Sequence, residues 1–212
     1  LREDVKPAQI LTKPIEACLD FERGKSWDYS NSGYVALGMI IEKATGKSYR
    51  RALKDMIFNP LRMSSSYYND WQLIIPNRAA GYEVDGGRNV NAQYISMSWP
   101  YSAGAISSTV LDLARWDSAL YTDALASRAS LRKMWTPEGA AVKAFYGFGW
   151  IVLKLGSYRM LAHGGGINGF SSYILRLPDQ RMSFIVLANN GSADTESIAI
   201  GIARLYFPKL AP

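Results

Sequence analysis

The segment from residue 145 to residue 188 constrains the fold of this chain more than any other. It contains four runs rich in β-branched and aromatic residues, the composition of β-strands: Phe145–Leu155, Tyr158–Ala162, Phe170–Leu177 and Met182–Ala188. Turn-forming pairs stand between neighbouring runs, at Gly156-Ser157 and at Pro178-Asp179. Because strands joined by such short turns run antiparallel, the sequence predicts a meander of three or four antiparallel strands.

A helix is predicted directly after residue 30. Apolar residues recur there at helical spacing, namely at Tyr34, Leu37, Ile41 and Ala44. Gly46 follows at the position where a left-handed C-terminal residue is favoured. We expect Ser32 or Asn31 to cap the N-terminus of this helix.

Further helices are expected over residues 49–58, 109–120, 125–135 and 195–207. The helix over 49–58 should end at Asn59, because a residue before proline is pushed out of the helical region. Thr109 and Asp112 resemble a capping box. Residues 1–30 are expected to be irregular, and residues 62–107 to be turn-rich, with aromatic side chains that cover patches of core.

Helices followed by a sheet and a final helix indicate an α+β fold with helices packed on an antiparallel sheet. No linker-like or repetitive stretch divides the chain, so we expect one domain over residues 1–212. Residues 1–140 would form its mainly helical region with loops, and residues 141–212 its sheet and C-terminal helix.

Composition excludes several classes of function. The net charge is +6, but the basic residues are scattered rather than gathered in a patch, which argues against nucleic-acid binding. No run of about 18 apolar residues occurs, so no membrane span is expected. Cys18 is the only cysteine and His163 the only histidine, which leaves no basis for a disulfide or a metal site.

Two short motifs suggest chemistry that their surroundings contradict. Thr45-Gly46-Lys47-Ser48 matches the end of a phosphate-binding loop, but that loop needs a glycine where Ile41 stands. His163-Gly164-Gly165-Gly166 matches the oxyanion motif of α/β-hydrolase esterases, which also need a G-x-S-x-G elbow and a second histidine. The chain contains neither, so both interpretations are rejected.

An ordered series of motifs is more specific. The series comprises Tyr29-Ser30-Asn31, Asn59-Pro60-Leu61, Ala103-Gly104-Ala105, Tyr146-Gly147-Phe148-Gly149-Trp150, His163-Gly164-Gly165, Asn168-Gly169-Phe170 and Leu187-Ala188-Asn189-Asn190. In this order, from about Leu19 to Phe207, the chain resembles the serine β-lactamase family in its broad sense. That family includes class C β-lactamases, D-alanyl-D-alanine carboxypeptidases and related esterases, all of the penicillin-recognising fold.

The resemblance implies a role for each matching residue. Tyr29 matches the tyrosine of the Y-x-N element, a proton carrier whose phenol would need nearby positive charge to lower its pKa. Asn31 matches the asparagine that holds the nucleophile's lysine and the substrate amide. His163, Gly164 and Gly165 match the K-T-G strand, and the N–H of Gly166 would be an oxyanion donor.

Structural interpretations of the same residues stay open. Tyr29 could pack on the helix that follows it, and His163 could hydrogen-bond within the sheet. Histidine is mostly neutral at neutral pH, whereas the family's lysine is a cation that recognises a substrate carboxylate. The histidine therefore favours esters, amides or D-amino-acid peptides over penicillins as substrates.

The family's Ser-x-x-K nucleophile is missing from the matching place. The one match, Ser130-Leu131-Arg132-Lys133, stands a hundred residues too late. We therefore expect the C-terminal portion of a serine hydrolase, inactive alone, whose partners are a small-molecule or peptide substrate and either an N-terminal fragment or another copy of the chain. Such a chain should expose apolar surface and a strand edge.

An alternative is a non-catalytic binding or regulatory protein on the same fold. Neither the residues nor the resemblance implies a cofactor. The compartment stays open: the first residues are charged and lack the apolar region of a signal peptide, and an export signal would have to lie upstream.

Overall fold

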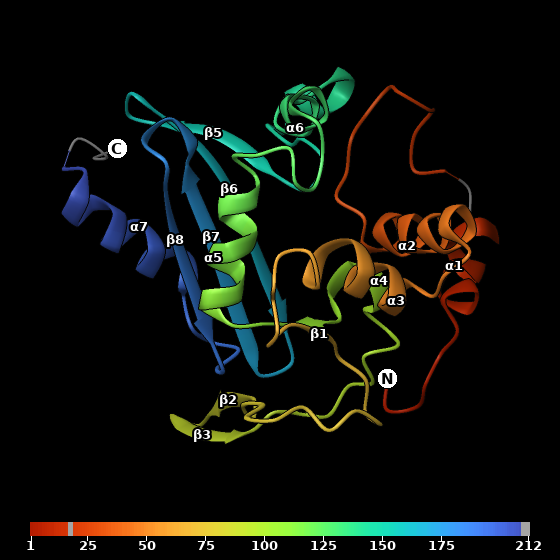
Figure 1. Ribbon diagram of the computed structural model, residues 1–212. Helices are drawn as coiled ribbons and strands as arrows, with labels where there is room; N and C mark the ends of the chain where they lie inside the picture. The colour runs from red at the N-terminus through yellow and green to blue at the C-terminus, as the bar shows by residue number, and fades with distance from the viewer. Residues whose placement is uncertain (17–18, 209–212) are drawn as a thin grey trace. The chain divides into compact units, whose positions relative to one another are not determined.

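The computed structural model describes residues 1–16 and 19–208, so Cys18 lies outside the described residues. The chain divides into two compact units (Figure 1). One unit comprises residues 1–78 and 93–116, and the other comprises residues 79–92 and the chain from residue 117 onward. This division does not test the prediction that residues 1–212 form one domain.

The first unit is mainly helical. Its elements are α1 (Pro7–Glu16), α2 (Asn31–Thr45), α3 (Tyr49–Leu53), a π-helical turn (Lys54–Phe58), β1 (Tyr67–Tyr68), α4 (Tyr101–Gly104), β4 (Ile106–Ser107) and most of α5 (Val110–Ala119). β1 and β4 form a short antiparallel pair. The core of this unit consists of Val35, Tyr49, Leu53, Phe58, Met63 and Tyr101.

Helix α1 corrects the prediction that residues 1–30 are irregular. It begins with Pro7 at its first position, where a helix needs no N–H donor and the fixed φ of proline suits the helix. Proline at this point therefore starts a helix rather than interrupting one.

Helix α2 is confirmed, but two of its details differ from the prediction. Ser30 is the cap, with its hydroxyl accepting from the N–H of Gly33, and Gly46 is left-handed at the C-terminus with φ +66°. The buried face is the one with Val35 and Gly38, while Leu37 is 49% exposed. A Cβ at Gly38 would lie 2.1 Å from Oγ of Ser102, so only glycine permits this close approach.

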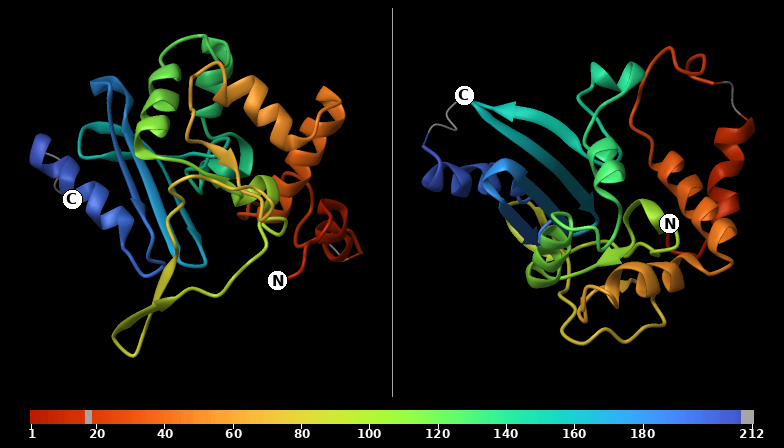
Figure 2. Two further views of the ribbon diagram at one scale, coloured as in Figure 1. Left: turned by 60° about the horizontal axis from the view of Figure 1, so that its bottom comes forward. Right: turned by 45° about the horizontal axis from the view of Figure 1, so that its top comes forward.

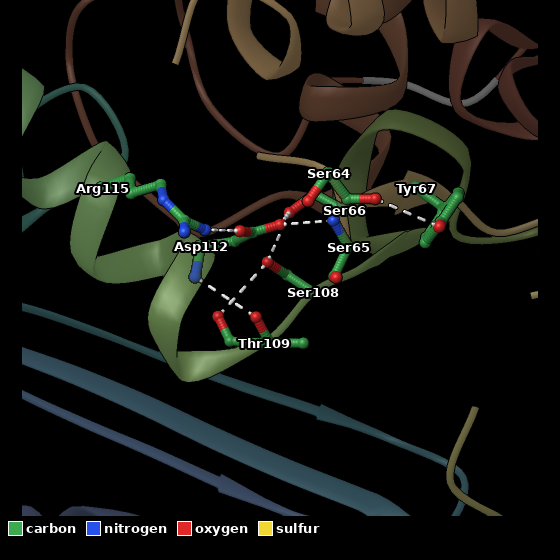
Figure 3. A network of polar contacts seen from close by, with 8 residues as sticks. All are labelled: Ser64, Ser65, Ser66, Tyr67, Ser108, Thr109, Asp112 and Arg115. Carbon is green, nitrogen blue, oxygen red and sulfur yellow. Dashed lines mark hydrogen bonds and ion pairs between the residues drawn. The ribbon is translucent and has the colours of Figure 1, made fainter. Parts of the chain in front are cut away.

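A buried carboxylate joins the loop before β1 to helix α5 (Figure 3). Asp112 accepts hydrogen bonds from the N–H of Ser65 at 2.8 Å and from the hydroxyl of Ser66 at 2.9 Å, and it pairs with Arg115. Thr109 caps α5 by accepting the N–H of Asp112 at 3.2 Å. The predicted capping by Thr109 is confirmed. The carboxylate of Asp112 does not complete the capping box but bonds to Ser65 and Ser66 in the loop before β1.

The second unit contains the predicted meander. Strands β5 (Ile151–Leu155), β6 (Tyr158–Ile167), β7 (Phe170–Leu177) and β8 (Met182–Ala188) pair antiparallel in chain order. Helix α7 (Thr195–Tyr206) packs along β7 and β8, as both views in Figure 2 show. Ala199, Ala203 and Leu175 are fully buried in this core. The α+β prediction is confirmed.

Five short elements complete the described part of this unit. The hairpin β2 (Tyr82–Asp85) and β3 (Arg88–Asn91) joins the end of β8 through a bridge between Tyr82 and Asn190. Helix α6 (Arg128–Met134) and 3₁₀ turns at Gly139–Val142 and Pro178–Gln180 lie in the connections. Helix α6 is shorter than predicted because Ser127 caps it.

Two strands differ in length from their predictions. β5 begins at Ile151 rather than Phe145, because Phe145 and Gly149 have φ of +53° and +77°, which an extended strand cannot contain. β6 continues five residues beyond Ala162, through the three glycines, because pairing with β7 holds them extended.

Candidate functional site

The loop that leads into α2 places Tyr29 beside Asn31. The carboxylate of Asp28 accepts the N–H of Tyr29 at 2.9 Å, and Ser30 caps the helix that begins at Asn31. The phenol of Tyr29 donates to Oδ1 of Asn31 at 3.2 Å. Tyr29 is 43% exposed, so it can be reached by another molecule or segment.

The surroundings of Tyr29 raise the pKa of its phenol. Partial burial is the largest cause, and the electrostatic effect of Tyr34, whose ring stacks at 6.2 Å, is the second. The sequence-based interpretation required a nearby positive charge that lowers this pKa. The described residues act in the opposite direction and keep the phenol protonated at neutral pH.

His163 stands in β6 with both ring nitrogens hydrogen-bonded inside its own unit. Nε2 lies 2.8 Å from the phenol oxygen of Tyr146, and Nδ1 lies 2.6 Å from the carbonyl oxygen of Gly164. Tyr146 is only 8% exposed, and its ring meets the imidazole edge-on at 5.8 Å. The interpretation of His163 as a hydrogen-bonded residue of the sheet is thus supported by its contacts.

The three glycines after His163 form a strand edge. β7 pairs with one side of them, placing Gly164 opposite Tyr173, Gly165 opposite Ser172, and Gly166 opposite Ser171. On the other side, β5 pairs with β6 only as far as Ala162. Within residues 1–16 and 19–208, no strand pairs with that side of residues 164–166.

The peptide between Gly165 and Gly166 has a defined orientation. The hydroxyl of Ser172 in β7 donates to the carbonyl oxygen of Gly165 at 3.3 Å. The peptide is trans, so the N–H of Gly166 points away from Ser172. A Cβ at Gly166 would meet no atom within 4 Å, which means that there is open space beside this position.

The predicted site residues thus form two groups. Tyr29 and Asn31 meet in the first unit, and His163, Gly164, Gly165 and Gly166 are continuous in the second. Sequence reasoning assigned no role to Tyr146 or Ser172, although Tyr146 was part of a recognised motif. Their contacts with His163 and Gly165 depend on strand pairing and turn geometry, which residue types alone do not reveal.

The Ser-x-x-K match at Ser130 belongs to the capping of α6. Ser127 accepts the N–H of Ser130 at 3.2 Å, and the two hydroxyls lie 3.0 Å apart. This arrangement provides an acceptor for a backbone N–H at the N-terminus of α6. It agrees with our rejection of this match as a nucleophile.

The described part of the chain contains no group of three or more His, Cys, Asp or Glu side chains arranged to hold a metal ion. Over the same residues, the helices are too short or too polar to cross a membrane.

Comparison with known proteins identifies the family. The family model described as Beta-lactamase matches residues 1–206. Penicillin-binding protein 4* of Bacillus subtilis (strain 168) is 33% identical over 195 residues, which are 83% of this chain and 42% of that protein.

Two solved structures share the fold and more than a quarter of the residues. A D-stereospecific amidohydrolase from Streptomyces sp. has a TM-score of 0.82 at 27% identity, covering 94% of this chain and 61% of that one. The octameric penicillin-binding protein homologue from Pyrococcus abyssi has a TM-score of 0.80 at 27% identity, covering 96% of this chain and 48% of that one. The chain thus spans about half the length of these relatives, and it belongs to the Beta-lactamase family, within the serine β-lactamase and transpeptidase superfamily.

Proposed function

We propose that this chain is the C-terminal part of a serine hydrolase that acts through an acyl-enzyme, and that it is inactive without an additional segment that carries the nucleophile. The observation that carries the proposal is the strand edge at residues 164–166, where the N–H of Gly166 points away from the neighbouring strand. Membership of the Beta-lactamase family over residues 1–206 supports it.

In this proposal the three glycines bind the acyl group. Because Gly164, Gly165 and Gly166 have no side chains, a substrate can lie along their unpaired edge as an additional strand. The N–H of Gly166 would then donate to the carbonyl oxygen that becomes negative when the nucleophile attacks.

Tyr29 and Asn31 would serve proton transfer and substrate positioning. The phenol of Tyr29 would take the proton of the nucleophilic serine and return it to the leaving group. Since the described residues raise its pKa, a cation from the nucleophile's segment would have to lower it. Asn31, already bonded to the phenol, would hold that cation and the substrate amide.

The proposed substrates are amides, esters or peptides of D-amino acids. His163 stands where the family's lysine would pair with a carboxylate, and its ring nitrogens have partners within the protein. The Streptomyces relative is named as a D-stereospecific amidohydrolase, which favours amides as the first class to test.

The proposed macromolecular partner is the segment with the nucleophile or a second copy of the chain. An octameric relative with this fold supports the second choice. Nucleic acid is not proposed as a partner, because the basic residues are scattered.

The test compares the full-length gene product with this chain alone. Each is treated with a fluorophosphonate and, separately, with a β-lactam. The intact mass of each protein is then measured by mass spectrometry under denaturing conditions. We expect one probe on a serine of the full-length protein and none on this chain. Hydrolysis of D-phenylalanine amide should exceed that of L-phenylalanine amide and of the β-lactam.

A matched pair of variants tests the strand edge in the full-length protein. Gly166→Ala adds a methyl group in the open space beside the proposed oxyanion donor, and we expect a displaced acyl group and a fall in kcat/KM of about 100-fold. Gly201→Ala, in α7, likewise meets no atom within 4 Å and should leave kcat/KM unchanged. A full-length protein that takes up neither probe and hydrolyses no substrate would favour a binding or regulatory protein on this fold.

A further inference from the structure

Tyr146 is a buried polar residue to which the proposed chemistry assigns no role. It lies in the turn before β5, and its side chain is 8% exposed. Its phenol oxygen is 2.8 Å from Nε2 of His163, a residue 17 positions later in the chain.

The partners of the imidazole determine where its proton lies. A carbonyl oxygen only accepts hydrogen bonds, so Nδ1, at 2.6 Å from the oxygen of Gly164, must carry a proton. In the neutral ring Nε2 is then the acceptor, and the phenol of Tyr146 is the donor. A hydrogen bond donated by Tyr146 to Nε2 therefore favours the tautomer with its proton on Nδ1.

The hydrogen bond to Gly164 also orients the strand edge. It fixes the direction of the Gly164 carbonyl, and the N–H of Gly165 in the same trans peptide points the opposite way. Glycine residues have the greatest backbone freedom, and pairing with β7 holds the three glycines extended from one side. The ring of His163 adds a second contact at the carbonyl of the first glycine.

We infer that Tyr146 is a positioning residue that holds His163 in the Nδ1–H tautomer, so that the imidazole clamps the Gly164 peptide rather than presenting a nitrogen to the substrate. The inference deepens the proposed function and rests on it for its catalytic consequence. It assigns the site to acyl donors that present no carboxylate beside Gly164, such as amides of amino acids.

The first test measures the tautomer directly and needs no catalytic activity. Because His163 is the only histidine, long-range ¹H–¹⁵N correlation spectra of this chain contain one imidazole pattern. At a pH where the ring is neutral, we expect a protonated Nδ1 and an unprotonated Nε2. Finding the proton on Nε2 in the unsubstituted protein would overturn the inference, whatever the behaviour of any variant.

The variant Tyr146→Phe keeps the ring and removes the donor. We expect the neutral imidazole to shift toward the Nε2–H tautomer, and an unchanged pattern in a folded variant would contradict the inference. Tyr158→Phe, at the start of the same strand β6, is the matched control and should leave the pattern as it is. Thermal unfolding of each variant shows whether it is folded.

In the full-length protein, Tyr146→Phe should lower kcat/KM for an amide by about tenfold, the effect of losing one hydrogen bond that orders the site. If no substrate is hydrolysed, the proposed function fails while the spectra still decide the tautomer. If substrate is hydrolysed and the spectra show Nε2–H, the proposed function stands and the positioning role fails.

Discussion

The carboxylate of Glu83 lies 2.7 Å from the backbone nitrogen of Gly169, a residue 86 positions later. Glu83 belongs to β2, and Gly169 to the turn that follows the glycine-rich edge of β6. Gly169 has φ +77°, and a Cβ there would lie 2.6 Å from that of Ala92, so only glycine fits. This hydrogen bond ties the β2–β3 hairpin to the turn beside the proposed substrate edge.

Replacing Glu83 by alanine should therefore loosen this turn. The N–H of Gly169 would lose a charged acceptor, and we expect the free energy of unfolding to fall by about 1–3 kcal/mol. Urea denaturation measures the loss, and hydrogen exchange at Gly169 locates it. Glu138→Ala, at an exposed position, is the control, and equal losses for the two variants would refute this account.

Arg176 and Asp117 form a buried ion pair, and removing one partner should be costly. Arg176 is fully buried, with its guanidinium 4.9–5.5 Å from the ring centres of Tyr121, Trp135 and Trp150. Asp117→Ala leaves this cation without its carboxylate, and we expect a loss of about 3–5 kcal/mol in the free energy of unfolding.

Two further variants make the test of this pair specific. The double variant Asp117→Leu/Arg176→Met removes both charges and should be more stable than Asp117→Ala, because no uncompensated charge stays buried. Arg50→Ala breaks a half-exposed pair with Asp70 at 3.6 Å, and about 0–1 kcal/mol is expected. A double variant less stable than Asp117→Ala would show that packing, not charge, dominates.

Alkaline pH should destabilise the first unit through Tyr68. Burial, followed by the charge of Asp70, raises the pKa of its phenol from 10.0 to about 12. Between these values the unfolded chain releases the proton while the folded chain keeps it, so the free energy of unfolding falls as the pH rises from about 10. Urea denaturation at a series of pH values measures the slope.

The variant Tyr68→Phe should show a shallower fall over the same pH range. Tyr94→Phe is the matched control, since Tyr94 is 53% exposed, and it should follow the unsubstituted protein. Identical slopes for all three proteins would mean that Tyr68 does not contribute to the alkaline loss.

The outer face of α7 carries an apolar stripe that predicts self-association. Ile198, Ile202 and Leu205 follow one another at helical spacing and are 46%, 41% and 81% exposed. Beside this helix, β8 has a single neighbour, β7, in the sheet of the described residues. Apolar stripes and unpaired strand edges are surfaces on which proteins associate.

We expect this chain alone to sediment as a concentration-dependent oligomer. Ile202→Lys places a charge in the stripe and should shift the distribution toward the monomer. Ser197→Lys adds the same charge on a different face of α7 and should not. A cooperatively unfolding monomer at all concentrations would contradict the predicted association.

The elements that could be predicted depend on residues close together in the chain. The meander follows from β-rich runs with turn residues between them, and Gly46 ends α2 because glycine accepts the left-handed conformation. The contact between Tyr29 and Asn31 spans two positions, so its motif could be read directly from the sequence. The catalytic roles of these two residues stay predictions.

The features that only the tertiary structure decided depend on residues far apart in the chain. The buried face of α2 is set by the approach of Ser102 to Gly38, and three glycines form a strand because β7 pairs with them. Asp112 bonds to Ser66 rather than completing a capping box, and Tyr146 reaches His163. Periodicity and turn chemistry are local interactions that the sequence by itself determines, whereas a side chain's hydrogen-bond partner is chosen among all the groups that folding brings within about 3 Å.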